Sequence, residues 1–237
     1  MSLNVIYFVN YFKGPFWLET NRTGNEFMRI TKGVTKLKSS PMHQRLDTRS
    51  GEEATAWFGN LAAQILTMKY LSLPLIFVPV PNSDCCVNNN RISRTTRLAE
   101  SVVKCIRSGV VLDTLRWVKT MRPSHQGGSR DAKYLYDNLI LTKQLSVGTY
   151  VLVDDIITTG AHLRAAAARL GGAGQPCHLA LCVGKTTRTT SRRAFVISEE
   201  VLPQFNVPFN VPIAGDCSNK EINRSTCDAH HIPAVPI

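Results

Sequence analysis

Short apolar runs alternate with amphipathic segments through the middle of the chain. Three runs predict buried strands: "LPLIFVPVP" (73–81), "TYVLVDD" (149–155) and "CHLALCVG" (177–184). Two segments predict helices that end at glycines: "RTTRLAESVVKCIRSG" (94–109) and "AHLRAAAARLGG" (161–172). Because strands that alternate with helices favour a parallel sheet, we expect an α/β core.

A longer amphipathic segment, "SGEEATAWFGNLAAQILTMKYL" (50–71), precedes the first of these strands. Ser50 and Glu53 have the spacing of a capping box, which predicts a helix beginning there. Apolar residues follow at helical spacing. Trp57 and Phe58 lie among them, and we assign both to the core rather than to a base-stacking surface.

The residue composition and the hydrophobic pattern change towards both ends of the sequence. Residues 1–48 contain short runs such as "VIYFV" and predict a strand-rich N-terminal cap or extension. Residues 191–237 are rich in Pro and Asn and predict an irregular C-terminal extension. Between them, residues 49–190 are expected to form the α/β core.

Composition and charge narrow the class of protein. Of the 237 residues, 43% are hydrophobic and 19% charged, which is typical of a globular chain rather than a disordered one. No apolar run approaches the length of a membrane span, and the first residues lack a basic segment before the apolar one, so we expect a cytoplasmic protein with no membrane partner. The seven cysteines are then expected to be thiols.

The formal net charge is +11, and it is concentrated in two places. Asp84 to Arg130 contains nine basic and three acidic residues, a net +6. A second cluster comprises Lys185, Arg188, Arg192 and Arg193. Such a surface serves solubility or binds a polyanion, either nucleic acid or a phosphorylated small molecule.

The segment "VLVDDIITTGAHL" (151–163) carries the most specific chemistry. In open parallel sheets, ligands bind at the carboxyl ends of strands, where Asp154 and Asp155 are expected. Thr158 to Ala161 then precede a helix, whose free N–H groups and dipole favour a phosphate. Two adjacent carboxylates repel each other unless hydroxyl groups or a cation lie between them, and ribose hydroxyls or Mg²⁺ meet that need.

This segment resembles the phosphoribosyl pyrophosphate (PRPP) motif of the type I phosphoribosyltransferases. The resemblance implies a Rossmann-like parallel-sheet core, with Asp154 and Asp155 on the ribose hydroxyls and on Mg²⁺, directly or through water. It also implies that Thr158, Thr159, Gly160 and Ala161 hold the 5′-phosphate. His162 stands where the family commonly has a hydroxyl side chain; it either donates to the phosphate or turns outward.

Longer stretches are most similar to the ComF-type branch of this family. They are "FVPVPNSDCCVNNNRISRTTRLAE", "VKTMRPSHQGGSRDAKYLYDNLIL" and "LCVGKTTR". The second is similar to the branch's mobile segment, which carries Arg, Gln, Arg and Asn in order; here these would be Arg122, Gln126, Arg130 and Asn138. The paired-cysteine module that often opens ComF proteins is absent from the sequence.

The same resemblance places a pyrophosphate loop after the strand at 73–81. It comprises Pro81, Asn82, Ser83 and Asp84, with Arg91 or Arg94 near the leaving group. A turn of this composition exposes backbone N–H groups to an anion. It is equally consistent with an ordinary strand exit.

Other groups of residues give weaker indications of a functional site. Cys217, Cys227, His230 and His231 have metal-ligand chemistry, but their spacing fits no common zinc site. His125 is either an acid–base group or an exposed loop histidine.

Two classes of function remain from the sequence. One is an enzyme that binds PRPP or a nucleoside 5′-phosphate with Mg²⁺ and transfers the phosphoribosyl group to a nitrogen nucleophile, releasing pyrophosphate. The other is a non-catalytic PRPP- or nucleotide-sensing module, or a competence- or defence-linked effector, with nucleic acid on its basic surface. The sequence leaves the acceptor and the oligomeric state open.

Overall fold

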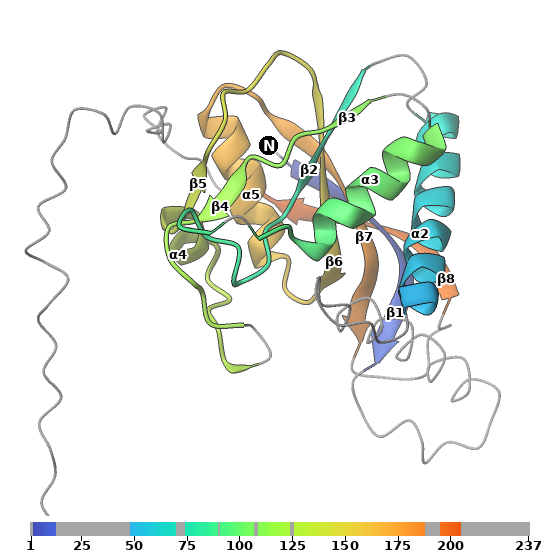
Figure 1. Cartoon of the computed structure of the whole chain (residues 1–237), viewed down its shortest axis with the longest axis horizontal. Helices are drawn as coiled ribbons and strands as arrows, with labels where there is room; N and C mark the ends of the chain where they lie inside the picture. The colour runs from blue at the N-terminus through green and yellow to red at the C-terminus, as the bar shows by residue number, and fades with distance from the viewer. Residues whose placement is uncertain are drawn as a thin grey trace, which may run out of the picture.

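The computed structural model describes residues 2–12, 48–69, 74–89, 91–106, 109–123, 126–187 and 195–204. Within these ranges the chain has an α/β fold built on a mostly parallel sheet of six strands (Figure 1). The strand order is β3-β2-β6-β7-β1-β8, and only β8 runs antiparallel to its neighbour. The predicted α/β class with a parallel sheet is confirmed.

The strands of the main sheet are β1 (Ser2–Phe12), β2 (Leu75–Pro79), β3 (Val110–Val111), β6 (Thr149–Ile157), β7 (Cys177–Thr187) and β8 (Phe195–Pro203). A second, two-stranded sheet pairs β4 (Leu115–Trp117) with β5 (Leu139–Leu141). The helices are α2 (Thr48–Lys69), α3 (Arg94–Ile106), α4 (Ala132–Asp137) and α5 (Ala161–Gly172).

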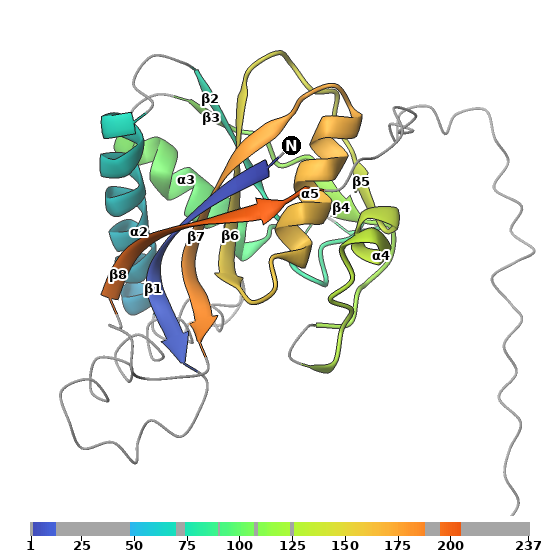
Figure 2. The same ribbon diagram turned by 180° about the vertical axis from the view of Figure 1, so that it is seen from behind.

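Helices cover both faces of the main sheet. Helices α2 and α3 pack on one face, and α5 packs on the other, which Figure 2 shows from behind. The side chains of β6 alternate between the two faces of the sheet. Tyr150 and Leu152 pack on the α5 side, whereas Val151 and Val153 pack on the α2–α3 side. A strand buried on both faces has an uninterrupted apolar sequence, which is why "YVLV" has no polar position.

The order of the strands creates a switch point. From β2 the chain passes through α3 to β3, and from β6 it passes through α5 to β7, so the two connections leave in opposite directions. Neighbouring strands whose connections diverge leave a crevice at their carboxyl ends, where ligands bind in open α/β sheets. Here that crevice lies between β2 and β6.

Both predicted extensions contribute strands to the main sheet. Ser2–Phe12 is not part of a separate cap, because β1 lies between β7 and β8. Phe195–Pro203 is not irregular, because it forms β8 at the edge. A continuous apolar run at the N-terminus is typical of an inner strand. Residues 13–47 and 205–237 lie outside the described ranges.

Two predicted boundaries also shift. Helix α2 begins at Thr48, so Ser50 lies inside the helix rather than at its N-cap. Strand β6 continues through Asp154 and Asp155 to Ile157, past the predicted end of the strand. In the described part of the chain, no helix has the length and apolar character needed to cross a membrane.

Gly184 marks a tight approach between strands in the middle of the sheet. A Cβ atom there would lie 2.5 Å from Val9 Cγ2 and 2.9 Å from the Val9 backbone oxygen. We predict that Gly184→Ala lowers the free energy of unfolding by about 1–3 kcal/mol through overpacking, measured by urea denaturation. Gly171→Ala is the matched control, because a Cβ in that helical position meets nothing within 4 Å. It should be neutral or stabilising by up to about 1 kcal/mol; equal effects of the two variants would contradict the packing argument.

Candidate functional site

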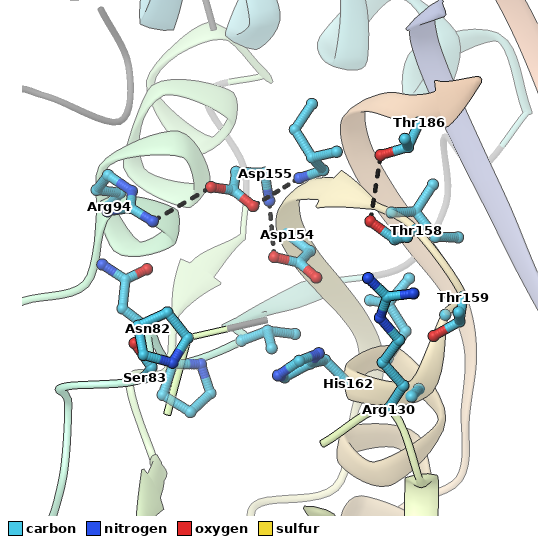
Figure 3. Close-up of a pocket in the computed structure, with 18 of the residues that line it drawn as sticks. Asn82, Ser83, Arg94, Arg130, Asp154, Asp155, Thr158, Thr159, His162 and Thr186 are labelled. Carbon is cyan, nitrogen blue, oxygen red and sulfur yellow. Dashed lines mark hydrogen bonds and ion pairs between the residues drawn. The ribbon is translucent and has the colours of Figure 1, made fainter. Parts of the chain in front are cut away.

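A pocket of about 490 Å³ opens at the carboxyl ends of the strands, at the β2–β6 switch point (Figure 3). Its volume is in the range of small-molecule sites. The lining brings together segments that are far apart in the sequence: the loop after β2, the start of α3, the end of β6, the turn into α5, and the ends of β1 and β7. The pocket therefore lies where the strand order predicts a ligand site.

Asp154 and Asp155 occupy the end of β6 and line the pocket. The Asp155 backbone N–H donates to Asp154 Oδ1 at 2.8 Å, and the Ile156 N–H donates to Asp155 Oδ1 at 2.6 Å. Each carboxylate therefore accepts a hydrogen bond from the backbone of the next residue, which orients it. Both acids that the sequence singled out thus line the pocket.

Asp155 also pairs with an arginine from a different element. Arg94 Nη2 lies 3.4 Å from Asp155 Oδ2, and the Asp155 side chain is only 17% exposed (Figure 3). Arg94 is the first residue of α3. The Ser93 and Thr95 hydroxyls hydrogen-bond to each other, and Thr95 Oγ1 donates to the Val80 carbonyl at 2.6 Å. The start of α3 is thus tied to β2, which fixes where Arg94 enters the pocket.

The turn from β6 into α5 has the features of an anion site. Gly160 is the N-cap of α5, with φ of 74°, and it offers no side chain to the first N–H groups of the helix. A Cβ at this position would also lie 2.4 Å from Leu202 Cδ1 of β8. Thr158 Oγ1 lies 3.1 Å from Thr186 Oγ1 of β7, which holds the turn against the sheet. Uncapped N–H groups at a helix start favour a phosphate.

The loop after β2 faces this turn across the pocket. Pro81, Asn82, Ser83 and Asp84 all line it, as the resemblance implied. The loop is closed by its own backbone, because the Cys85 N–H donates to the Asn82 carbonyl at 2.9 Å. The Met121 N–H donates to the Ser83 carbonyl at 2.7 Å. The loop is therefore a defined turn held from behind.

His162 lies inside the pocket rather than turning outward. Its ring is directed towards the loop that carries Asn82 and Ser83 (Figure 3). It meets the Trp117 ring edge to face, with centroids 5.8 Å apart. Burial lowers the pKa of His162, and the neighbouring Asp155 carboxylate opposes that shift. The imidazole is thus packed against an aromatic ring, an arrangement that the sequence did not anticipate.

The remaining predicted residues divide between pocket and surface. Arg130 lines the pocket. Arg91 does not; it is exposed and pairs with Asp84 at 2.6 Å. Arg122 and Gln126 are exposed and do not line the pocket. Asn138 caps α4, where its side-chain amide donates to the Tyr134 carbonyl at 2.9 Å.

Other predicted groups lie wholly or partly outside the described residues. His125 and the Cys217, Cys227, His230 and His231 group are not among them. The same is true of Arg188, Arg192 and Arg193 in the second basic cluster. Lys185 of that cluster is described, and it pairs with Glu200 of β8.

Sequence reasoning missed two polar pocket residues, Tyr11 and Thr186. Both stand at carboxyl ends of parallel strands, β1 and β7, and their backbones are paired in register. Burial and the Asp155 charge raise the pKa of the Tyr11 phenol. The signal was available in principle, since an inner parallel strand directs its last residues to the same edge as Asp154. Tyr11 was hidden because residues 1–48 were predicted to be a cap or extension, whereas Thr186 lies within the predicted core, in the stretch "LCVGKTTR".

A divalent cation fits the acidic side of the pocket. Mg²⁺ commonly takes one or two carboxylates and completes its shell with water and substrate phosphates. Asp154 and Asp155 are such a pair. Within the described ranges, no group of three or more His, Cys, Asp or Glu side chains gathers into a protein-only metal cage. These two carboxylates therefore suit a cation whose remaining ligands are water and substrate phosphates.

No protein-family model matches this chain, and no curated protein matches it significantly in sequence. The assignment of the site therefore depends on the geometry of the chain itself.

The partly buried His162 imidazole should make the stability of the fold depend on pH. Because its pKa is lower in the folded protein than its ordinary value, the unfolded chain binds the proton more tightly. The free energy of unfolding should therefore decrease as pH falls through about 6.5. His162→Asn should flatten this dependence in urea denaturation between about pH 7.5 and 5.5. His178→Asn, on the surface of β7, is the control. An unchanged pH dependence in His162→Asn would contradict the assignment of the shift to this residue.

Proposed function

We propose that the chain binds PRPP with Mg²⁺ in this pocket and transfers the phosphoribosyl group to a nitrogen nucleophile, with release of pyrophosphate. The observation that carries the proposal is the meeting of Asp154 and Asp155 with an uncapped helix start at one switch point. Together with the resemblance of residues 151–161 to the PRPP motif, it supports a type I phosphoribosyltransferase-like core.

The pocket offers complementary chemistry to each part of such a ligand. The N–H groups at the start of α5, with Thr158 and Thr159, suit the 5′-phosphate. Asp154 and Asp155 accept hydrogen bonds from the ribose hydroxyls. The loop Pro81–Asp84, with Arg94 at its side, suits the pyrophosphate. Arg130 approaches from the other side of the pocket and adds positive charge.

The proposed transfer requires charge stabilisation more than a strong base. As the bond from the anomeric carbon to pyrophosphate breaks, negative charge collects on the leaving group and positive charge on the sugar. Arg94 neutralises the leaving group, while the carboxylates of Asp154 and Asp155 support the cationic sugar. Bound Mg²⁺ supplies further positive charge for the pyrophosphate.

The Arg94–Asp155 ion pair adds a constraint. A ligand that hydrogen-bonds to Asp155 must compete with the guanidinium, which lies 3.4 Å from the carboxylate. A pyrophosphate group gives Arg94 a second anion to bind. A ligand that carries both a diol and a pyrophosphate therefore replaces the Arg94–Asp155 ion pair with contacts of its own to both residues. A simple sugar phosphate does not.

The central test removes the two carboxyl charges. Asp154→Asn with Asp155→Asn should abolish PRPP binding in calorimetry with Mg²⁺, while far-UV circular dichroism stays unchanged. Both side chains lie at the carboxyl end of β6 and line the pocket rather than the hydrophobic core, so we expect the secondary structure to be retained. The matched control is Asp131→Asn with Asp137→Asn, which removes two charges beside α4.

Pyrophosphate release measured with a panel of nucleobases then separates transfer from binding alone. Binding of PRPP without release would favour the sensing module. Unchanged PRPP affinity in the double variant would remove the proposed site.

The basic surface yields a separate prediction about nucleic acid. Arg97 and Lys104 are exposed on α3, outside the pocket. If this face binds nucleic acid, Arg97→Gln with Lys104→Gln should reduce the salt dependence of binding by up to about two phosphates' worth. The measurement is a fluorescence-anisotropy titration at several salt concentrations with single-stranded DNA of arbitrary sequence. An absence of wild-type binding at low salt would limit the basic residues to solubility and the pocket.

A further inference from the structure

Trp117 contacts two segments that line the pocket, although it does not line the pocket itself. It is the last residue of β4 and its side chain is fully buried. Its indole N–H is directed at two carbonyls of the loop after β2, Pro81 O at 3.3 Å and Asn82 O at 2.9 Å. Its backbone N–H donates to the Cys85 carbonyl at 3.1 Å. The side chain and backbone of Trp117 therefore both hold the turn that begins at Pro81.

The same ring reaches the opposite side of the pocket. Trp117 and His162 pack edge to face, at an interplanar angle of 83°. His162 belongs to the first turn of α5, two residues after the N-cap Gly160. Trp117 thus joins the loop after β2 to the start of α5 through one side chain. These are the two segments that face each other across the pocket.

The polarity of these contacts separates Trp117 from an ordinary core residue. An apolar side chain of similar size fills the same space, but it takes the indole donor away from the buried Pro81 carbonyl and leaves the Asn82 carbonyl with the Cys85 N–H. A buried carbonyl without a donor is unfavourable, so the loop would shift towards water. Because the loop and α5 share this one ring, a shift of the loop also changes the surface against which His162 packs.

We propose that Trp117 is a positioning residue that holds the Pro81–Asp84 loop in register with the start of α5. A ligand with two separated phosphate groups then finds both segments already in place, which lowers the entropic cost of binding. His162 acts through the same contact: its ring supports Trp117 rather than the phosphate. The identity of the ligand rests on the proposed function, whereas the positioning does not.

Hydrogen exchange tests the positioning without any ligand. In Trp117→Phe the indole donor is lost and an aromatic ring remains. Exchange at the Cys85 and Val87 amides, which are hydrogen-bonded within this turn and to Trp117, should become about tenfold faster. His162→Thr should give the same direction of change, and His162→Phe should restore protection because it keeps an edge-to-face partner. Trp57→Phe, on the distant helix α2, is the matched control.

Ligand binding supplies the second readout. Inorganic pyrophosphate, a probe of the loop, should bind Trp117→Phe about tenfold more weakly, because its binding turn is no longer preorganised. Ribose 5-phosphate, a probe of the α5 turn, should change by less than about twofold, because the backbone N–H groups of that turn remain in place.

The outcomes are distinct. Unchanged exchange at Cys85 and Val87 in both Trp117→Phe and His162→Thr would overturn the positioning role. Equal weakening of the two probes together with faster exchange across the whole chain would do the same, because it would indicate general destabilisation. If the wild type binds neither probe, the proposed function fails, and the exchange measurement alone decides the role of Trp117. If Trp117→Phe does not fold, His162→Thr and His162→Phe decide it.

Discussion

The divergence of two chain connections between β2 and β6 is the constraint on which the site depends. Strand β2 leads through α3 to one side, and β6 leads through α5 to the other, so neither of these two connections covers the carboxyl ends of the strands. The loop after β2 and the turn after β6 are then directed into one crevice. Backbone topology thus brings together segments more than sixty residues apart before any side chain contributes.

Side chains convert this crevice into a site with separated charges. The acids at the end of β6 lie between Arg94 on α3 and the uncapped start of α5. A carboxylate pair repels a phosphate, whereas a helix start and an arginine attract one. On the proposed function, the pocket selects a ligand whose hydroxyl groups and phosphates are spaced to match. This spacing, rather than net positive charge, favours a phosphorylated sugar over a general polyanion.

The sequence predicted the centre of this architecture well and its margins poorly. Residues 151–161 and the apolar runs around them have strong local signals, because inner parallel strands are apolar and the left-handed N-cap of α5 needs a glycine. The structure confirms the predicted helix at residues 161–172 and the buried strand at 177–184, and it places Asp154, Asp155 and Thr158–His162 together in the pocket.

The failures have a common cause, which is pairing between distant segments. Nothing local to Ser2–Phe12 shows that it pairs with β7, so the sequence did not reveal Tyr11 as a pocket residue. Trp117 contacts the loop after β2 and the start of α5, which both lie far from it in the sequence, and the orientation of His162 follows from this contact. Arg91 illustrates the opposite error. It was placed near the pyrophosphate loop, but it pairs with Asp84 at the surface instead of entering the pocket.

The central claim is that one ligand spans both segments of the crevice, and an NMR titration of the labelled protein with PRPP and Mg²⁺ tests it most directly. The account predicts saturable shifts in the backbone amides of Thr159–His162 and of Asn82–Asp84 with a single dissociation constant, because both sets contact the same bound molecule. Shifts confined to one segment, shifts centred on another surface, or no shifts at all would contradict it.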